Sequence, residues 1–327
     1  MQSKSILSLL LLGTSAIAHP GQSPVQKRTL TPDNTCGNTG AGANHGYTCD
    51  PSVSNGGPCC SSNGYCGTTS AYCGTGCQSA FGTCGHNVSP APPKSGCTWN
   101  VANAGSFTQH KTFDFTNNQF PAGLAISTDT IGAGTAPYSQ LYKTQNVAVS
   151  GGALRLTVPG GQHASPITGA EVYTTDKDIL YGSVRTTFQV SNVAGTCHGS
   201  FFYKTDNQET DIEILTKDLA TGAHYTNQNV AGNGPSTTIT GALPSDATTN
   251  YHEYRLDWIP GKTLFYLDGV LQKTLTANVP SVAGEWIWNN WSNGDSGWTS
   301  GPPTADNVMK IQRIDMYYNR TGNAGTC

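Results

Sequence analysis

The chain of 327 residues has few charged residues and few methionines. Asp, Glu, Lys and Arg together make up 11% of it, and it has 3 Met. Glycine (39 residues), Ser, Thr, Asn and aromatic residues are plentiful instead. This composition favours an all-β extracellular protein over a helical cytosolic one, and long helices are not expected.

A second feature that the sequence lacks, after its first residues, is an apolar run long enough to span a bilayer. Residues 1–18 combine basic Lys4, an apolar run and the cleavage pattern Ala16-Ile17-Ala18, which predicts a secretory signal peptide. The pair Lys27-Arg28 leaves open whether residues 19–28 are removed as a pro-segment. Since RTGNAGTC at the C-terminus lacks the hydrophobic tail of a lipid-anchor signal, we expect a secreted protein, extracellular or held at the cell wall by binding.

Basic residues are also in short supply. Taking the three basic residues of 1–28 from the 17 in the chain leaves 14 against 20 acidic residues, a net charge of about −6. This balance argues against a nucleic acid partner. We expect a monomer with no membrane span.

Cysteine is abundant in one short segment, where eight of the eleven cysteines fall within about 50 residues. So short a segment cannot bury enough apolar surface to stabilise itself, and in an exported chain such density predicts disulfides. The alternative, a zinc site, needs paired C-x-x-C clusters, which are absent. The eight residues are Cys36, Cys49, Cys59, Cys60, Cys66, Cys73, Cys77 and Cys84.

The stretch CCSSNGYCGTTSAYC, residues 59–73, resembles the hevein-like chitin-binding module, which would cover residues 29–85. Flat aromatic faces and a hydroxyl suit binding of N-acetylglucosamine. By position the resemblance implies sugar contacts for Ser61, Tyr65 and Tyr72, whereas Asn63 stands where the family usually has an aromatic residue. It also implies the pairings Cys36 with Cys60, Cys49 with Cys66, Cys59 with Cys73 and Cys77 with Cys84.

Residues 86–96, HNVSPAPPKSG, are rich in Pro and Ser without periodicity and predict a linker. From residue 97 to 327, short alternating apolar runs recur between Gly, Pro and Asn clusters, which predicts two packed antiparallel sheets. The turns Pro260-Gly261 and Asp268-Gly269 predict a β-meander. The runs are GALRLTVPG, YGSVRTTFQV, FFYKTD, TDIEIL, YRLDWIPG, KTLFYLDG and IQRIDMYY.

Three carboxylates stand at alternate positions of one run: Glu209, Asp211 and Glu213. On a strand they share one face, while Ile212 and Ile214 point to the opposite, core-facing side. Like charges side by side weaken a strand unless solvated, but on a cleft floor they raise one another's pKa. A retaining glycosidase needs one protonated and one ionised carboxyl close to each other. On a straight strand Glu209 and Glu213 would lie too far apart, so the sheet is expected to curve and bring them together.

The pattern E-T-D-I-E at 209–213 resembles the E-x-D-x-E signature of glycoside hydrolase family 16, as do Tyr181-Gly182-Ser183-Val184 and YHEYRLDWIPGKTLFYLDG at 251–269. The resemblance implies a β-jelly-roll (concanavalin A-like) sandwich with a concave sugar-binding cleft. It implies that Glu209 is the nucleophile, that Asp211 orients it and that Glu213 is the general acid and base. It implies no cofactor, either metal or organic.

Four of the six tryptophans lie in EWIWNNWSNGDSGW, residues 285–298. Trp286 and Trp288 share a parity, and we expect about half of the four rings in the core. Trp291 and Trp298 are candidates for stacking on glucan. His198 is either a structural neighbour or part of the acid site, and Cys97, Cys197 and Cys327 leave one thiol over after one disulfide.

The sequence thus predicts a secreted retaining glycosidase that acts on chitin or β-glucan of a fungal cell wall and is held there by its chitin-binding module. Its module combination resembles the Crh-type enzymes that link chitin to glucan, although Gln208 stands where that group often has Asp. An endo-β-glucanase that hydrolyses its substrate is the close alternative. A protein that only binds chitin, in the wall or at a host surface, is the alternative from another class.

Overall fold

The structure, a computed structural model, describes residues 30–49, 57–67, 70–73, 77–78, 80–82, 92 and 94–322. The expected signal peptide, the expected pro-segment and most of the expected linker lie outside these residues. Within the described part of the chain, no helix is long and apolar enough to cross a membrane.

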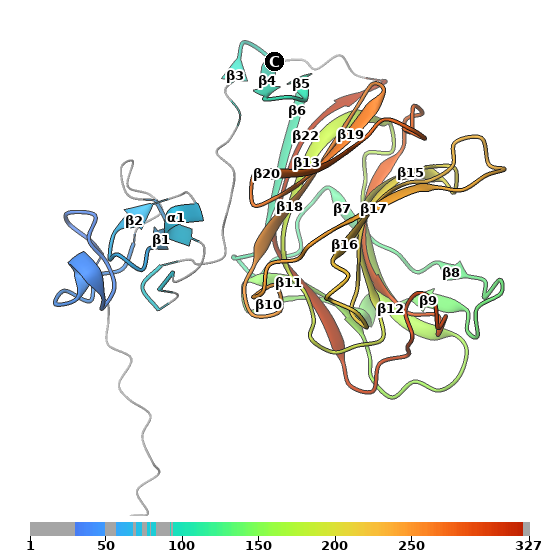
Figure 1. The fold of residues 1–327 in the computed structure, drawn as a ribbon, viewed down its shortest axis with the longest axis horizontal. Helices are drawn as coiled ribbons and strands as arrows, with labels where there is room; N and C mark the ends of the chain where they lie inside the picture. Colours follow the sequence, from blue (N-terminus) through green and yellow to red (C-terminus); the bar gives the residue numbers. More distant parts are fainter. Residues whose placement is uncertain are drawn as a thin grey trace, which may run out of the picture.

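Two large antiparallel sheets pack face to face in the part of the chain from residue 109 onward (Figure 1). In the described residues the first sheet has eight strands, in which β6 pairs with β22 beside the main order. Its strands are β10 (Val147–Ser150), β11 (Ala153–Val158), β22 (Asn307–Arg320), β13 (Ile179–Gln189), β18 (His252–Ile259), β19 (Lys262–Leu267), β20 (Val270–Leu275) and β6 (Gln109–Asp114).

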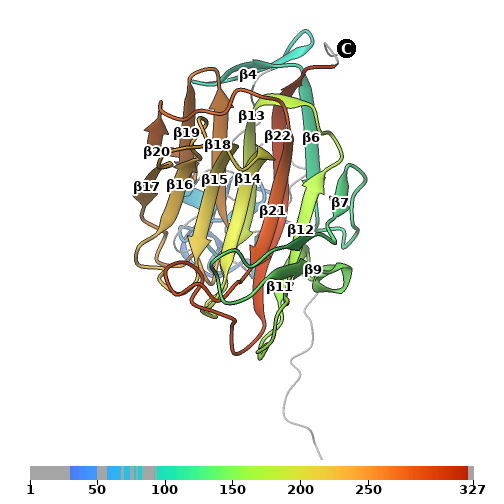
Figure 2. The same cartoon turned by 90° about the vertical axis from the view of Figure 1, so that its right-hand side faces the viewer.

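The second sheet has nine strands among the described residues, and Figure 2 shows its central strands side by side. Its pairing is antiparallel except between β9 and β12, and β7 pairs with β12 beside the main order. In order the strands are β17 (Thr237–Gly241), β16 (Ala223–Asn227), β15 (Gln208–Leu215), β14 (Cys197–Thr205), β21 (Glu285–Trp291), β12 (Ile167–Thr174), β9 (Gln140–Tyr142) and β8 (Thr130–Ile131), with β7 (Leu124–Ile126).

The expected strands and turns are confirmed. Each of the seven apolar runs lies on a strand, namely β11, β13, β14, β15, β18, β19 and β22. Strands β18, β19 and β20 form the expected meander. Asp268 and Gly269, between β19 and β20, have φ values of 50° and 76°, and positive φ at two successive turn positions is what a tight hairpin matching the strand twist requires.

The core lies between the two sheets and is built from the inward face of each strand. Its largest fully buried rings include Trp258, Trp286 and Trp288, each 0% exposed. The indole N–H of Trp258 donates to the Pro280 carbonyl at 2.7 Å, and that of Trp288 donates to Thr186 Oγ1 at 2.9 Å. Because these polar atoms are bonded, the two rings contribute apolar burial without an unsatisfied donor.

The remaining elements are short. A three-stranded sheet contains β3 (Lys94–Ser95), β4 (Thr98–Val101) and β5 (Gly105–Phe107). Since β3 comes before Cys97, the end of the expected linker is part of this sheet. The other elements are η1 (Gly40–Gly42), β1 (Cys59–Cys60), β2 (Cys66–Gly67), α1 (Ser70–Cys73) and η2 (Thr144–Asn146).

Three of the four pairings implied for the cysteine-rich segment are present: Cys36 with Cys60, Cys49 with Cys66, and Cys59 with Cys73. Cys77 is also disulfide-bonded, and Cys84 lies outside the described residues. In the large domain Cys97 is disulfide-bonded, and Cys197 is the free cysteine among the described residues. The thiol left over after one disulfide is therefore Cys197.

Candidate active site

Strand β15 has the two faces that its sequence predicts. Ile212 and Ile214 are 1% and 0% exposed and belong to the core between the sheets. Glu209 and Glu213, on the opposite face, line a pocket. Because side chains alternate along a strand, Asp211 stands between these two carboxyls on the same face, where it is 1% exposed.

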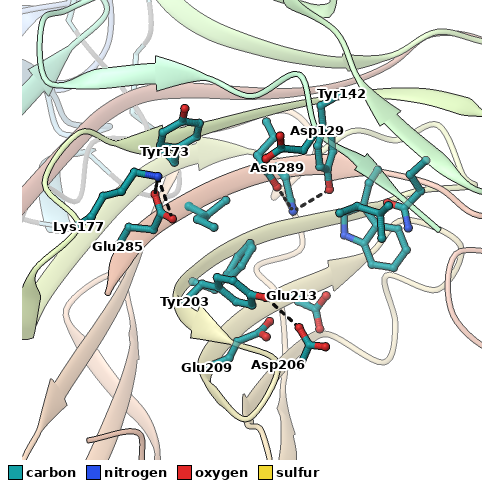
Figure 3. A pocket seen from close by; sticks show the side chains of 16 residues that line it. Asp129, Tyr142, Tyr173, Lys177, Tyr203, Asp206, Glu209, Glu213, Glu285 and Asn289 are labelled. Carbon is teal, nitrogen blue, oxygen red and sulfur yellow. Dashed lines mark hydrogen bonds and ion pairs between the residues drawn. The ribbon is translucent and has the colours of Figure 1, made fainter. Parts of the chain in front are cut away.

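The pocket has a volume of about 410 Å³ and lies over the second sheet (Figure 3). Its floor comes from β12, β14, β15 and β21. Six carboxyl groups line it, against one lysine, Lys177, whose Nζ lies 3.0 Å from Glu285 Oε2. The acidic lining residues are Asp129, Glu171, Asp206, Glu209, Glu213 and Glu285.

Glu209 and Asp211 share a hydrogen bond. Burial raises the pKa of Glu209 to about 7, with a further rise from the charge of Glu213, while the bond to Asp211 opposes the shift. Burial and then the charge of Glu209 raise the pKa of Asp211 well above its ordinary value. Of the two groups, Asp211 therefore holds its proton more tightly and donates to Glu209, and this bond favours the ionised form of Glu209.

Asp211 has a second partner, Gln228, whose Nε2 donates to Asp211 Oδ2 at 3.2 Å. The Asp211 carboxyl thus lies between the amide of Gln228 and the carboxyl of Glu209, and these two bonds fix its orientation. Because Asp211 in turn bonds to Glu209, it can hold Glu209 in the orientation that a nucleophile needs.

Glu213 also has a pKa raised above its ordinary value, and burial is the main cause. The thiol of Cys197 on β14 donates to Glu213 Oε1 at 3.2 Å, and Trp298 forms a further hydrogen bond to the same carboxyl. Both bonds oppose the effect of burial. A carboxyl with a raised pKa holds its proton to a higher pH than an ordinary glutamic acid, and when it faces a cleft it can serve as a general acid.

One row of residues crosses four strands of the floor in register. It runs from Glu171 on β12 through Asn289 on β21 and Gly199 on β14 to Glu213 on β15. Asn289 Nδ2 donates to Glu171 Oε2 at 3.1 Å and to the Tyr142 hydroxyl at 3.3 Å. A Cβ atom at Gly199 would collide with Asn289 Oδ1, so glycine is needed at this position.

Glu171 is the other carboxyl of this row, and burial raises its pKa to about 7 against the hydrogen bond from Asn289. At the β14–β15 turn the Tyr203 hydroxyl donates to Asp206 Oδ1 at 2.8 Å, and both residues line the pocket (Figure 3). Sequence reasoning missed Glu171, Asn289, Tyr203 and Cys197. Tyr203 carried a signal, because it lies two residues from Phe201 on an alternating run, but the others come together only through strand pairing.

The four clustered tryptophans divide as expected. Trp286 and Trp288 are in the core, whereas Trp291 is half-buried and lines the pocket. Trp298, also half-buried, contacts Glu213 and packs against His224 with ring centroids 5.1 Å apart. Stacking of Trp291 and Trp298 on glucan stays a prediction.

His198 does not belong to the site, so the functional alternative for it is wrong. It pairs with Ile214, on the core-facing side of β14, and is 1% exposed. Its Nε2 and Asn307 Oδ1 are 2.9 Å apart. Burial lowers its pKa to about 4, so the ring is neutral and structural.

In the cysteine-rich segment, Tyr65 is 49% exposed and Tyr72 is half-buried. A Cβ atom at Gly67 would overlap the ring of Tyr72, which therefore lies flat against the backbone of β2. Ser61 is 3% exposed, and its Oγ accepts from the backbone N–H of Tyr65 at 3.2 Å, so it supports the turn that presents Tyr65. The sugar contacts of all three residues stay a prediction.

The part of the chain that the structure describes has one close group of at least three potential metal ligands, formed by Cys36, Cys49 and Cys60. All three are disulfide-bonded. Since thiolates are the form that binds metal, these sulfur atoms are no ligand set.

Comparison with known proteins places the chain in a family. The family model described as glycosyl hydrolases family 16 matches residues 135–303, more than half of the chain. A "Beta-glucanase" of Paenibacillus polymyxa is 34% identical over 127 residues, which are 37% of this chain and 51% of that protein. "Crh-like protein 3" of Botryotinia fuckeliana is 30% identical over 95 residues, 29% of this chain and 21% of that protein.

The match thus spans about half the length of the bacterial relative and a smaller part of the fungal one. Among solved structures, the β-glucanase of Bacillus licheniformis superposes with a TM-score of 0.54 and 21% identity, covering 64% of this chain and 98% of that chain. This likeness shows the fold, an all-β sandwich of the jelly-roll type. With its E-x-D-x-E strand on the floor of a pocket and the family model matching across it, the chain belongs to glycosyl hydrolases family 16.

Proposed function

We propose that the protein is a secreted retaining glycosidase that acts on β-glucan, chitin or both in a fungal cell wall. The observation that carries the proposal is the set of three carboxyls on β15, two of which line the pocket while the third is buried between them. The β-glucanase and Crh-like relatives support a wall glucan as substrate.

In the proposed reaction, Glu209 attacks the anomeric carbon while Glu213 gives its proton to the oxygen of the departing sugar. The glycosidic C–O bond breaks, and a bond forms between the sugar and Glu209. Water or a sugar hydroxyl then attacks the same carbon, passes its proton to Glu213 and releases Glu209. Attack by water is hydrolysis, and attack by a sugar hydroxyl is transglycosylation.

The raised pKa of Glu213 suits the first step, because an acid must hold its proton at the working pH. The hydrogen bond from Asp211 suits the same step, because it favours the ionised form of Glu209 and orients its carboxyl. The proposed step needs the two glutamates in opposite protonation states, with Glu209 ionised and Glu213 protonated.

We further propose that residues 29–85 bind chitin and hold residues 97–327 on the wall. An exposed Tyr65 ring and the flat packing of Tyr72 on Gly67 support this role. Disulfides in this segment agree with an oxidising, extracellular location. Tethering raises the effective concentration of an insoluble substrate, which makes the module useful to the enzyme.

Product analysis by mass spectrometry tests the proposal. The purified full chain would be incubated with laminarin, mixed-linkage glucan or chitin oligosaccharides, with and without a fluorescent oligosaccharide acceptor. Longer labelled products would show transglycosylation, and only shorter unlabelled sugars would show hydrolysis. No product from any donor would favour the alternative that the protein only binds chitin.

Variants at the two glutamates complete this test. Glu209→Gln should abolish turnover, because an amide cannot form the glycosyl ester, while the fold and chitin binding persist. Glu213→Gln should lower the rate on a glucan by about 10² to 10⁴, the usual contribution of a general acid. Unchanged turnover in Glu209→Gln would mean that another group is the nucleophile.

A further inference from the structure

Glu213 receives hydrogen bonds from two side chains that lie outside the family signature. Cys197 is 0% exposed at the start of β14, and its Sγ lies 3.2 Å from Glu213 Oε1. Trp298, in the segment after β21, bonds both to the carboxyl of Glu213 and to Cys197. Two side chains from two separate parts of the chain therefore meet at the carboxyl of Glu213.

The thiol of Cys197 is in the right state to donate. Burial first, and then the negative charge of Glu213, raise its pKa well above the ordinary value of 9. The S–H group is thus retained at any pH at which a wall enzyme would work. Cys197 is also free of a disulfide, so its one hydrogen is available to the carboxyl.

The segment that carries Trp298 is held by a bond to Lys217, by a bond within itself and by a ring contact with β16. Lys217 Nζ donates to the carbonyl of Ser296 at 2.9 Å. Thr299 Oγ1 donates to Asn293 Oδ1 at 3.2 Å, and the ring of Trp298 packs on His224, which pairs with Glu213 across β15 and β16. Trp298 is therefore held where its N–H can reach Glu213.

We propose that Cys197 and Trp298 are positioning residues for Glu213: together they hold its carboxyl in place for proton transfer to the oxygen of the departing sugar. The inference rests on the proposed role of Glu213 as general acid. Fixing the acid reduces the rotamers that it must lose on the way to the transition state. The same two bonds stabilise the ionised carboxyl, which Glu213 becomes once it has given up its proton.

Other titratable groups face Glu213, and none of them takes the place of the two donors. The neighbouring carboxylates disfavour ionisation of Glu213 by charge repulsion. His224 and Lys217 lie on the side of Trp298. These groups are Glu209 and Asp211 on β15, Glu171 on β12, Asp206 at the β14–β15 turn, Asp129 on the pocket wall, and His224 and Lys217.

Two substrates separate positioning of the acid from structural support. The first is the glucan oligosaccharide that the product analysis identifies, and the second is the 2,4-dinitrophenyl glycoside of the matching disaccharide. The second leaving group departs without a proton, so its kcat/KM does not depend on Glu213. Cys197→Ala and Trp298→Phe should each lower kcat/KM about tenfold on the oligosaccharide and leave the aryl glycoside within about twofold.

The pH profile gives a second readout. Loss of a donor to the ionised carboxyl raises the pKa of Glu213, so the alkaline limb of kcat/KM on the oligosaccharide should move upward by about half to one pH unit. Cys197→Ser, which keeps a donor, should restore most of the rate and the position of the limb. Ile214→Val removes one buried methylene from the core side of β15, and as a control it should change neither.

Equal losses on both substrates, or a limb that stays in place in both Cys197→Ala and Trp298→Phe, would overturn the proposal. Trp298→Phe keeps it testable if Cys197→Ala fails to fold, because Trp298 is half-buried rather than in the core. If Glu213→Gln keeps full activity on the oligosaccharide, the proposed function itself fails. If Glu213→Gln loses that activity while neither positioning variant shows the two effects, only this inference fails.

Discussion

Loss of hydration is the main cause of every shifted pKa among four carboxyls at the pocket floor. For Glu171, Glu209, Asp211 and Glu213 alike, loss of hydration outweighs the hydrogen bonds that favour the ionised form. Such groups work against the folded state when they are ionised. The site is therefore built at a cost in stability that changes with pH.

Glu171 allows this cost to be measured apart from the proposed chemistry. Its pKa of about 7 in the folded protein lies above the ordinary 4.5, so its contribution to stability is full below pH 4.5 and is lost as the pH rises through 7. A shift of that size corresponds to about 3 kcal/mol. We expect the free energy of unfolding to fall between pH 4.5 and 7, and Glu171→Gln to make this dependence less steep.

Urea unfolding at a series of pH values measures the effect. Glutamine keeps the acceptor for Asn289 but has no charge, so the variant should be more stable than the parent protein at pH 7 and similar at pH 4.5. Asp114→Asn, at a carboxyl whose side chain is 45% exposed, serves as the control and should keep the parent's slope. A slope that Glu171→Gln leaves unchanged would contradict the assignment of this cost to Glu171.

At the scale of the strands, the site depends on register. Glu171, Asn289, Gly199 and Glu213 come from β12, β21, β14 and β15, and each pair is directly opposite across the sheet. A slip by one residue in any of these strands would turn its side chain from the pocket to the core. Gly199 has no side chain, and the amide of Asn289 occupies the space that a side chain there would fill.

Gly199→Ala tests this packing. Its Cβ atom would collide with Asn289 Oδ1, so the amide must move away from Glu171 and Tyr142. We expect a loss of about 1 to 3 kcal/mol in stability, the usual cost of overpacking, and a lower kcat/KM on the oligosaccharide. Gly132→Ala meets no atom within 4 Å and should behave like the parent, and a stable, fully active Gly199→Ala would contradict the prediction.

Sequence alone predicted the elements better than the pairings. Alternation in TDIEIL gave the two faces of β15 directly, because period two is a local property of the chain. The same alternation put Trp286 and Trp288, at even positions, on the buried face of β21 and Trp291, at an odd position, on the pocket face. Glu171 and Asn289 carried no local signal, since they join the row of Glu213 through strands that are far apart in sequence, and the contact of Cys197 with Glu213 depends on the register of β14 with β15.

At the scale of the whole molecule, the two parts of the chain are stabilised by different means. The cysteine-rich segment has Cys36, Cys49, Cys60 and Cys66 as its buried cluster, so its core is made of disulfides. The sandwich has a large apolar core between its sheets. The proposed chitin binding and the proposed catalysis can therefore be impaired separately.

Tyr65 and Tyr72 provide the variants for this separation. Tyr65→Ala removes an exposed ring, and Tyr72→Ala removes the ring that lies on Gly67. Each variant should weaken binding to insoluble chitin by about tenfold, since such ring contacts contribute roughly 0.5 to 1.5 kcal/mol beyond area burial. The kcat/KM on a soluble oligosaccharide should stay at the parent's value. Sedimentation with chitin particles measures the first quantity, and reducing-sugar release the second.

Glu209→Gln is the matched control, because it should bind chitin like the parent while losing turnover. The rate on insoluble wall material depends on both chitin binding and catalysis. Because tethering acts through effective concentration, Tyr65→Ala should slow this rate and leave the rate on the soluble substrate unchanged. If Tyr65→Ala and Tyr72→Ala both bind chitin as the parent does, these two rings do not make the chitin contacts. If they lose chitin but digest wall material at the parent's rate, the segment binds chitin without serving catalysis.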